Sequence, residues 1–355
     1  MRHYLYLLTL IFILGCSEGP GTQDLDTITP LGILETNTTT EECIPNTVVG
    51  TYHSNYTTTD LSFDGNKLVL AHTNGIDIVD ITNRHEPIFL GSMSLQDSID
   101  KAKIKGDLVF AYLSDIVLSG LSIKVINISN VENPTTVSTI AYDVVYGDIH
   151  VESDFIHFGG EVNASKGRYY IYDISDQFNP HEAAVLDLSV LGDSNTFNLA
   201  LGSFVQKENL LYAQSNYLGS VNNIYVIDIT ERSSPVEVKT IGSEMSYLTS
   251  NNSHIFAGGE KKLKSYTIDS QTYLTEENNT VEGPDNYNHI TAIGNNVYSF
   301  GRLNGEISIT DFSDITAPTQ EEEKIYVHAS GNMVSDERYL YIADGAGLKI
   351  IDTCQ

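Results

Sequence analysis

The segment Ile78-Val79-Asp80-Ile81 decides the fold, because close variants of it return along the chain at nearly even spacing. The later copies are Val125-Ile126-Asn127-Ile128, Ile171-Tyr172-Asp173-Ile174, Val226-Ile227-Asp228-Ile229, Ser265-Tyr266-Thr267-Ile268, Ile309-Thr310-Asp311-Phe312 and Ile350-Ile351-Asp352-Thr353. Asp80 and Asp352 are 272 residues apart, which makes six intervals of about 45 residues. A period of this length is typical of folds that repeat one small structural unit.

Turn signals accompany the copies. A Ser or Thr follows the Asp position by two residues, and a Pro follows it by seven, at Pro87, Pro134, Pro180, Pro235 and Pro318. An Asp side chain that accepts a hydrogen bond from the backbone two residues later closes a turn, and Pro then begins an edge-type segment. We therefore predict that these Asp residues cap turns and do not bind a ligand. The fifth repeat departs from the pattern at Thr267 and Leu274.

Each repeat also contains an apolar strand that follows a short polar turn, such as Gly65-Asn66 before residues 68–71. Short polar turns join antiparallel neighbours, so each unit is expected to contain four antiparallel strands. No long segment has helical periodicity. Seven units of this kind predict an all-β fold, a seven-bladed β-propeller over residues 47–355.

The repeated phrase resembles the LVIVD repeat family of bacterial surface and secreted β-propeller proteins. The resemblance extends over residues 47–355 and implies the propeller fold. It implies no activity and no site residues, because the family has no generally assigned activity.

The first sixteen residues have the features of an export signal. Arg2 precedes an apolar run at residues 4–14, which is shorter than the ~20 residues of a membrane-spanning helix. The run ends in Ile13-Leu14-Gly15-Cys16, which resembles the bacterial lipobox. We predict a lipoprotein signal peptide over residues 1–15 and acyl chains such as palmitate on Cys16. A plain signal peptide with an unrelated Cys is the alternative.

Residues 16–46 are predicted to be the lipidated Cys and a flexible tether, since they are rich in Gly, Pro, Thr and Ser. Several acyl chains on one Cys suffice for stable anchoring, so the lipid would be the only membrane contact. Ser17 stands where well-studied lipoproteins retained in the inner membrane have Asp. That resemblance favours the outer membrane of a bacterial cell envelope, and both the periplasmic side and the cell surface stay open.

Two further cysteines, Cys43 and Cys354, flank the repeats. The last repeat ends after its third strand, and residues 46–52 form a strand-like segment before the first repeat. We expect this segment to complete the last blade, which closes the ring and places Cys43 beside Cys354. The sequence therefore predicts a disulfide, formed in an oxidising compartment. Two buried free thiols are the alternative.

The charge of the chain limits its partners. The 355 residues have a formal net charge of −28, from 19 Lys and Arg against 47 Asp and Glu. Because phosphate binding needs a basic surface, we predict no nucleic-acid partner. The 41% hydrophobic content excludes a disordered chain.

Loop lengths distinguish the two faces of the predicted ring. The tight turns and the Asp-to-Pro turns keep a constant length, whereas the loops between second and third strands lengthen at residues 112–120, 159–168 and 214–223. Variation on one face of a rigid scaffold is typical of a binding surface. Tyr112 and Tyr217 would supply contact area there for proteins or sugars. Drift in loops that contact nothing is the alternative.

Polar residues occur early in the inner strands, which line the channel of a propeller. The candidate binding residues are Asp60, Asp100, Asp148, His150, Tyr247, His289 and His328. A ring of Asp and His around one axis suits a cation or a polar ligand. We assign no metal ligands and predict no cofactor, and a merely solvated channel lining is the alternative.

Enzyme signatures are absent from the sequence, which has no HExxH, no GxSxG and no phosphate-binding Gly loop. We expect a non-catalytic cell-envelope lipoprotein that binds a protein or glycan partner through its variable loops. The alternative is an envelope hydrolase or lyase that acts on a glycan or small ester at the channel mouth. Propeller enzymes often draw on Asp, Glu, His or Tyr residues scattered over several blades.

Overall fold

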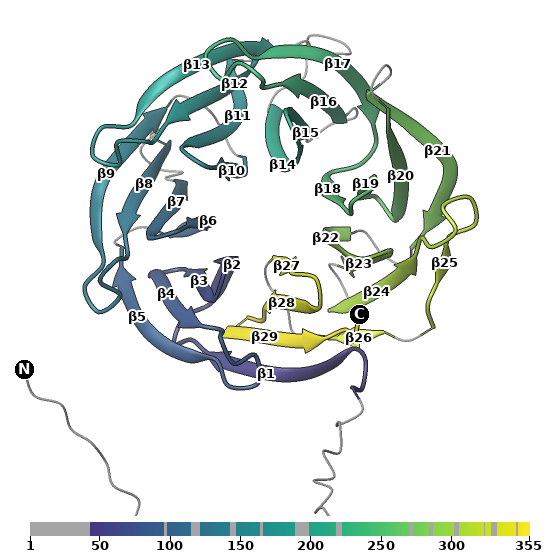
Figure 1. Ribbon diagram of the computed structural model, residues 1–355, viewed down its shortest axis with the longest axis horizontal. Helices are drawn as coiled ribbons and strands as arrows, with labels where there is room; N and C mark the ends of the chain where they lie inside the picture. Colours follow the sequence, from purple (N-terminus) through teal and green to yellow (C-terminus); the bar gives the residue numbers. More distant parts are fainter. Residues whose placement is uncertain are drawn as a thin grey trace, which may run out of the picture. The chain divides into compact units, whose positions relative to one another are not determined.

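Seven blades surround one axis in the computed structural model (Figure 1). The structure describes residues 43–95, 98–114, 121–142, 147–163, 166–188, 199–217, 222–269, 273–283, 287–301, 305–322, 324–327, 332–345 and 347–355. All regular secondary structure in these ranges is β-strand. Within the same ranges, no helix is long and apolar enough to cross a membrane.

The blades follow the sequence, and strands next to each other within a blade are antiparallel. Blade 1 consists of β2 (Thr58–Asp64), β3 (Lys67–His72), β4 (Gly75–Asp80) and β5 (Ile88–Ser94). Blade 2 consists of β6 (Ile99–Lys105), β7 (Leu108–Ser114), β8 (Leu121–Asn127) and β9 (Thr135–Tyr142). Blade 3 consists of β10 (Ile149–Glu152), β11 (Phe155–Asn163), β12 (Lys166–Asp173) and β13 (His181–Leu188). Blade 4 consists of β14 (Leu199–Lys207), β15 (Leu210–Tyr217), β16 (Asn222–Asp228) and β17 (Val236–Ser243). Blade 5 consists of β18 (Tyr247–Ser250), β19 (His254–Gly259), β20 (Lys262–Asp269) and β21 (Tyr273–Glu282). Blade 6 consists of β22 (Tyr287–Ile293), β23 (Asn296–Gly301), β24 (Glu306–Asp311) and the two short strands β25 (Thr319–Gln320) and β26 (Ile325–Tyr326), which both pair with β24. Blade 7 consists of β27 (Met333–Ser335), β28 (Tyr339–Ala343), β29 (Gly347–Asp352) and β1 (Thr47–His53).

The core lies between neighbouring blades. Each of the seven blade-to-blade contacts holds one cluster of buried apolar side chains from the alternating positions of both blades. Between blades 1 and 2, for example, Val69 and Ile78 pack with Ile104 and Val109. At about 25 cal/mol for each Å² of buried apolar surface, these clusters are the main source of stability. Each blade is thus stabilised by the two beside it.

The Asp positions of the repeat cap turns, as predicted. The backbone N–H of Thr82 donates to Asp80 at 2.7 Å. The same bond, at 2.7 to 2.9 Å, forms at Asn127, Asp173, Asp228 and Asp311. Such a bond stabilises the turn that leads to the outer strand.

Outer strands approach the turn of the next blade very closely. A Cβ on Gly91 would lie 1.8 Å from the carbonyl oxygen of Val131, and one on Gly50 would lie 1.9 Å from that of Arg84. Only glycine fits at such a contact. Ser138 instead donates a 2.7 Å hydrogen bond to the carbonyl of Gln177. A small residue of the outer strand thus makes this close contact in blades 7, 1 and 2.

The fifth blade forms although its repeat lacks the turn signals. Its third and fourth strands pair up to Ile268 with Leu274 and Asp269 with Tyr273. In this blade the strands thus continue where the other blades have an Asp-to-Pro turn. Leu274 replaces Pro there, and it can take part in the strand ladder because it retains a backbone N–H.

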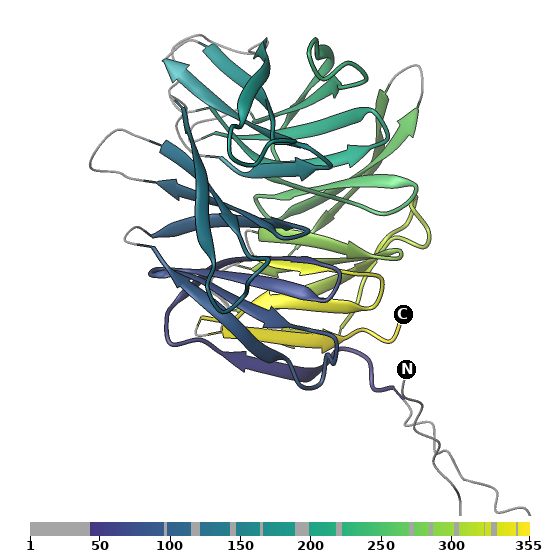
Figure 2. The same ribbon diagram turned by 60° about the vertical axis from the view of Figure 1, so that its left-hand side comes forward.

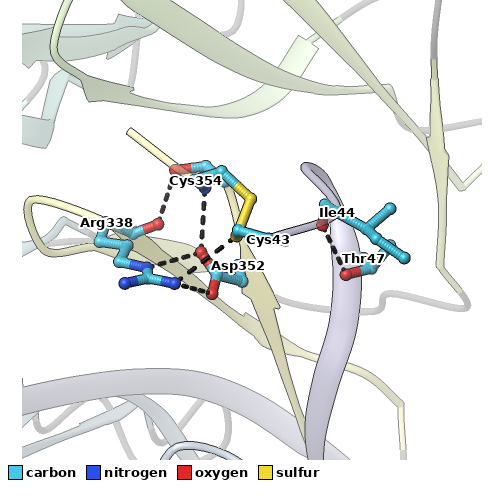
Figure 3. Close-up of a disulfide and its surroundings, with 7 residues drawn as sticks. Cys43, Ile44, Thr47, Arg338, Asp352 and Cys354 are labelled. Atoms are coloured by element: carbon cyan, nitrogen blue, oxygen red, sulfur yellow. Dashed lines mark hydrogen bonds and ion pairs between the residues drawn. A yellow bond between two sulfur atoms is a disulfide. The ribbon is translucent and has the colours of Figure 1, made fainter. Parts of the chain in front are cut away.

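The first and last described strands meet in blade 7. Strand β1 pairs antiparallel with β29, from Thr47 with Asp352 to His53 with Gly347, and Figures 1 and 2 show the two strands side by side. A disulfide joins Cys43 to Cys354, with their Cα atoms 5.9 Å apart (Figure 3).

A salt bridge supports the disulfide. Arg338 donates to both carboxylate oxygens of Asp352, at 2.8 and 2.6 Å, and the same Asp accepts from the backbone N–H of Cys354 at 2.9 Å (Figure 3). Asp352 belongs to the seventh copy of the repeat, so its turn-capping bond here positions Cys354 for the disulfide with Cys43.

Candidate binding site

The seven inner strands enclose an axial hollow of about 530 Å³. Every one of them, from β2 to β27, contributes to its lining. Figure 1 shows these strands nearest the axis of the ring. Three of the candidate residues, Asp148, His150 and His289, line this hollow together. They come from blades 3 and 6, so only closure of the ring brings them to one place.

Lys103 on β6 also lines the hollow, and its ammonium group lies between two of the predicted carboxylates. The Nζ is 3.4 Å from Asp148 and 3.8 Å from Asp60. Asp60 is completely buried, and it accepts a 2.9 Å bond from the N–H of Ala102 and another from the amide of Asn332. Burial opposes ionisation of Asp148, but the charges of Lys103 and Lys101 outweigh it and lower the pKa of this carboxyl.

His150 is oriented by a chain of hydrogen bonds. Gln206 donates its amide to Glu152 and to the carbonyl of Glu208, which leaves its Oε1 to accept from Nε2 of His150 at 2.8 Å. The Nδ1 of His150 therefore carries the lone pair. Burial lowers the pKa of His150 to about 4, so the ring is neutral at pH 7.

Glu152 connects the hollow to the contact between blades 3 and 4. It accepts a bidentate pair from Arg232, at 2.8 and 2.9 Å, and a 3.0 Å bond from Nε2 of His157. The other ring nitrogen of His157 accepts from the hydroxyl of Tyr169 at 2.5 Å. Burial acts against ionisation of Glu152, but these partners outweigh it and hold its pKa at about 2.

His289 faces the hollow from blade 6. The ring of Tyr247 meets it edge-on, with the ring centroids 5.9 Å apart. Its Nδ1 is buried and has no hydrogen-bond partner among the described residues. Burial and the charges of Lys101 and Lys103 lower the pKa of His289 to about 3.

The remaining candidates lie elsewhere. Asp100 is in β6 at the bulge between Ile99 and Lys101 and does not line the hollow. The expectation that Tyr112 lies in a loop is wrong: it is in β7, 3% exposed, within the core between blades 2 and 3. Tyr217 is the last residue of β15, and its side chain is not among those that the structure describes. His328 lies outside the described residues.

The sequence analysis missed Lys103, Gln206, Glu152 and Arg232. For Lys103 a signal was present, since Lys alternates along β6 with Ala102 and Ile104, which belong to the core between blades 1 and 2, so that Lys103 is on the other face of the strand. No local signal links Glu152 to Arg232, because they are 80 residues apart and only the packing of adjacent blades joins them.

Among the residues that the structure describes, potential metal ligands do not gather in the hollow. Among the described residues, one group of three His, Cys, Asp or Glu has its ligand atoms within 4.8 Å, namely Cys43, Asp352 and Cys354. Two of its members are joined in the disulfide and have no thiolate to offer. In the hollow, the ammonium of Lys103 occupies the position between Asp60 and Asp148 that a cation would take.

The loop face differs from the expectation in blades 3 and 4. Much of the predicted loops 159–168 and 214–223 is strand. Strand β11 continues to Asn163, β12 begins at Lys166, and β15 continues to Tyr217. The extended strands join the two blades, because Gly160 of β11 pairs with Ala200 of β14. The longer connections are thus hairpins that continue the blades, and the two blades share one sheet.

Comparison with known proteins agrees with this architecture. The LVIVD repeat family matches residues 57–94, 215–242 and 328–353. No curated protein matches the chain.

Solved structures that resemble the chain show the same fold at low sequence identity. Kuenenia stuttgartiensis hydrazine synthase has a TM-score of 0.62 at 11% identity, over 88% of this chain and 98% of that one. The β-propeller domain of Myceliophteria thermophila Cps50 (Swd1) has 0.61 at 12%, over 85% and 99%. Saccharomyces cerevisiae Sqt1 has 0.57 at 10%, over 87% and 99%. At these identities the likeness concerns the fold alone, and the chain is a seven-bladed β-propeller that carries LVIVD repeats.

Proposed function

We propose that this chain is a lipoprotein of the bacterial outer membrane whose propeller binds a protein or glycan partner through the face that carries the longer connections. The observation that carries the proposal is the difference between the two faces. One has the uniform turns capped at Asp80, Asp173 and their equivalents. The other has connections of unequal length, and strands of blades 3 and 4 that extend into one shared sheet.

The lipobox-like Ile13-Leu14-Gly15-Cys16 supports the anchor, and the disulfide between Cys43 and Cys354 supports an oxidising envelope compartment. Expression with labelled palmitate tests the anchor. Label on the wild-type chain, lost together with membrane association in Cys16→Ala, is the expected result. An unlabelled wild-type chain would contradict it.

Capture of partners from the native envelope tests the binding face. The full-length chain is compared with a variant in which the connections at residues 115–120 and 218–221 are shortened. The expected result is a specific partner that the shortened variant loses. The matched control replaces exposed Glu86 and Glu132, near the constant turns, by Gln, and it should keep the partner. A partner retained by the shortened variant, or lost by the control, would refute the assignment of the face.

A second candidate is an envelope hydrolase or lyase that acts on a glycan or small ester. The observation in its favour is His150, a neutral imidazole oriented by Gln206 so that its Nδ1 lone pair is available as a base. Turnover of envelope glycans that His150→Gln abolishes, with partner binding unchanged, would favour this reading over the first.

A further inference from the structure

We propose that the axial hollow is a second binding site, separate from the loop face, for a neutral monosaccharide. Its volume of about 530 Å³ is within the ~300–1,000 Å³ range of small-molecule pockets. All seven inner strands line it, so the site would exist only in the closed ring. Three features of the wall indicate the class of ligand: its balance of charge, one oriented acceptor, and an aromatic ring beside that acceptor.

The charges at the wall of the hollow cancel. The ammonium groups of β6 are matched by an equal number of carboxylates around them, and the two sets are Lys101, Lys103 and Lys105 against Asp60, Asp64 and Asp148. Burial holds the pKa of His150 at about 4 and that of His289 at about 3, so both rings are neutral at pH 7. Since a charged ligand would enter without an opposite charge to pair with, the wall suits a neutral polar one.

His150 supplies an acceptor that the protein has already oriented. Its Nε2 donates to Gln206, which donates to Glu152, and Glu152 is fixed by two bonds from Arg232. The Nδ1 of His150 keeps its lone pair and remains accessible, whereas the Nδ1 of His289 is buried. Because the ring is held in one orientation before a ligand arrives, a hydroxyl group that donates to this Nδ1 requires little further ordering of the protein.

An apolar ring lies beside this acceptor. Phe204 of blade 4 is only partly buried and lines the hollow, and its ring centroid is 6.2 Å from that of His150. A monosaccharide combines hydroxyl groups with a face of C–H groups, and such a face packs against an aromatic ring. Thr249 and Ser250 of blade 5 also line the hollow, and their hydroxyl groups can donate or accept. Three adjacent blades, 3 to 5, thus offer both kinds of contact that a neutral sugar uses.

Isothermal titration of the full-length chain with glucose, galactose and mannose tests the class of ligand. At least one of these hexoses should bind in the millimolar range or more tightly. Its uronate, which has a carboxylate in place of the terminal CH₂OH group, should bind no more tightly. A tenfold rise in sodium chloride should leave the affinity for the hexose unchanged, because salt does not screen a neutral ligand. Binding of none of the three hexoses, or tighter binding of the uronate, would overturn the proposal.

Variants locate the bound sugar. His150→Leu removes the oriented acceptor and should weaken hexose binding at least tenfold. Thr249→Val removes a hydroxyl at nearly constant volume and should weaken it several-fold; it leaves the bonds of His150 intact, so it decides the question alone if His150→Leu does not fold.

Matched controls make the same changes on outer strands away from the hollow. Thr51→Val in blade 7 and His181→Leu in blade 3 should leave hexose binding unchanged. Hexose binding that a folded Thr249→Val variant keeps in full would contradict the assignment. The variant with shortened connections should bind the hexose as the wild type does, and loss of binding there would place the sugar on the loop face instead.

Discussion

Glu152→Gln removes one negative charge from the contact between blades 3 and 4 and keeps the shape of the side chain. Its pKa is about 2 in the fold against an ordinary 4.5. At about 1.36 kcal/mol for each tenfold change in proton affinity, this corresponds to about 3.4 kcal/mol. The side chain is 12% exposed beside an Arg that is 24% exposed, so solvent screening reduces the expected stabilisation to roughly 2 kcal/mol. Because folding lowers this pKa, the stabilisation is complete above pH 4.5 and is lost as the pH falls towards 2.

Urea unfolding of both full-length proteins, followed by circular dichroism at pH 7 and pH 3, measures this effect. The wild type should be more stable by roughly 2 kcal/mol at pH 7, and by about half of that or less at pH 3. Asp187→Asn is the control. It breaks the ion pair between Asp187, which is 57% exposed, and Arg168, which is 37% exposed, so it should change the stability little at either pH. Equal stability of Glu152→Gln and wild type at pH 7, or a difference that does not shrink at pH 3, would refute the reasoning.

Two further predictions concern the seam and the ring packing. Replacing Cys43 and Cys354 by Ser should lower the free energy of unfolding by roughly 2–5 kcal/mol, because the cross-link closes a loop with a sequence separation of 311 residues; a urea midpoint equal to that of the wild type would contradict it. Gly91→Ala should cost more than about 2 kcal/mol, because its Cβ would lie 1.8 Å from the carbonyl oxygen of Val131, whereas Gly242→Ala meets no atom within 4 Å and should change the melting temperature little. Equal melting temperatures of the two Ala variants would count against this view of the packing.

Most of the fold could be predicted from the sequence because the same short turn motif recurs along the chain. The capping bond from the N–H of Thr82 to Asp80 depends only on residues two positions apart, and the recurrence of its motif gives the number of blades. The extended strands of blades 3 and 4 could not be predicted in this way. The pairing of Gly160 with Ala200 is non-local, and a segment rich in Gly and polar residues has no alternation to indicate a strand.

The candidate site could be predicted in part for the same reason. Asp148, His150 and His289 were identified because inner strands must face the axis of a propeller. Their electrostatics could not be predicted, since the ammonium of Lys103 comes from a neighbouring blade and decides what the carboxylates can do. Tyr112 was misplaced because a residue at the end of an apolar strand can belong to either the strand or the following loop.

The position of the disulfide has a mechanical consequence. Thr47 and Asp352 form the first pair of the β1–β29 ladder, so a pull on the chain ahead of Cys43 would otherwise peel β1 from its neighbour one pair at a time. Because Cys43 precedes Thr47 and is bonded to Cys354, the sulfur–sulfur bond would carry the force from Cys43 to Cys354. The hydrogen bonds between β1 and β29 would then bear no load. The propeller would therefore respond to stretching as a covalently closed hoop.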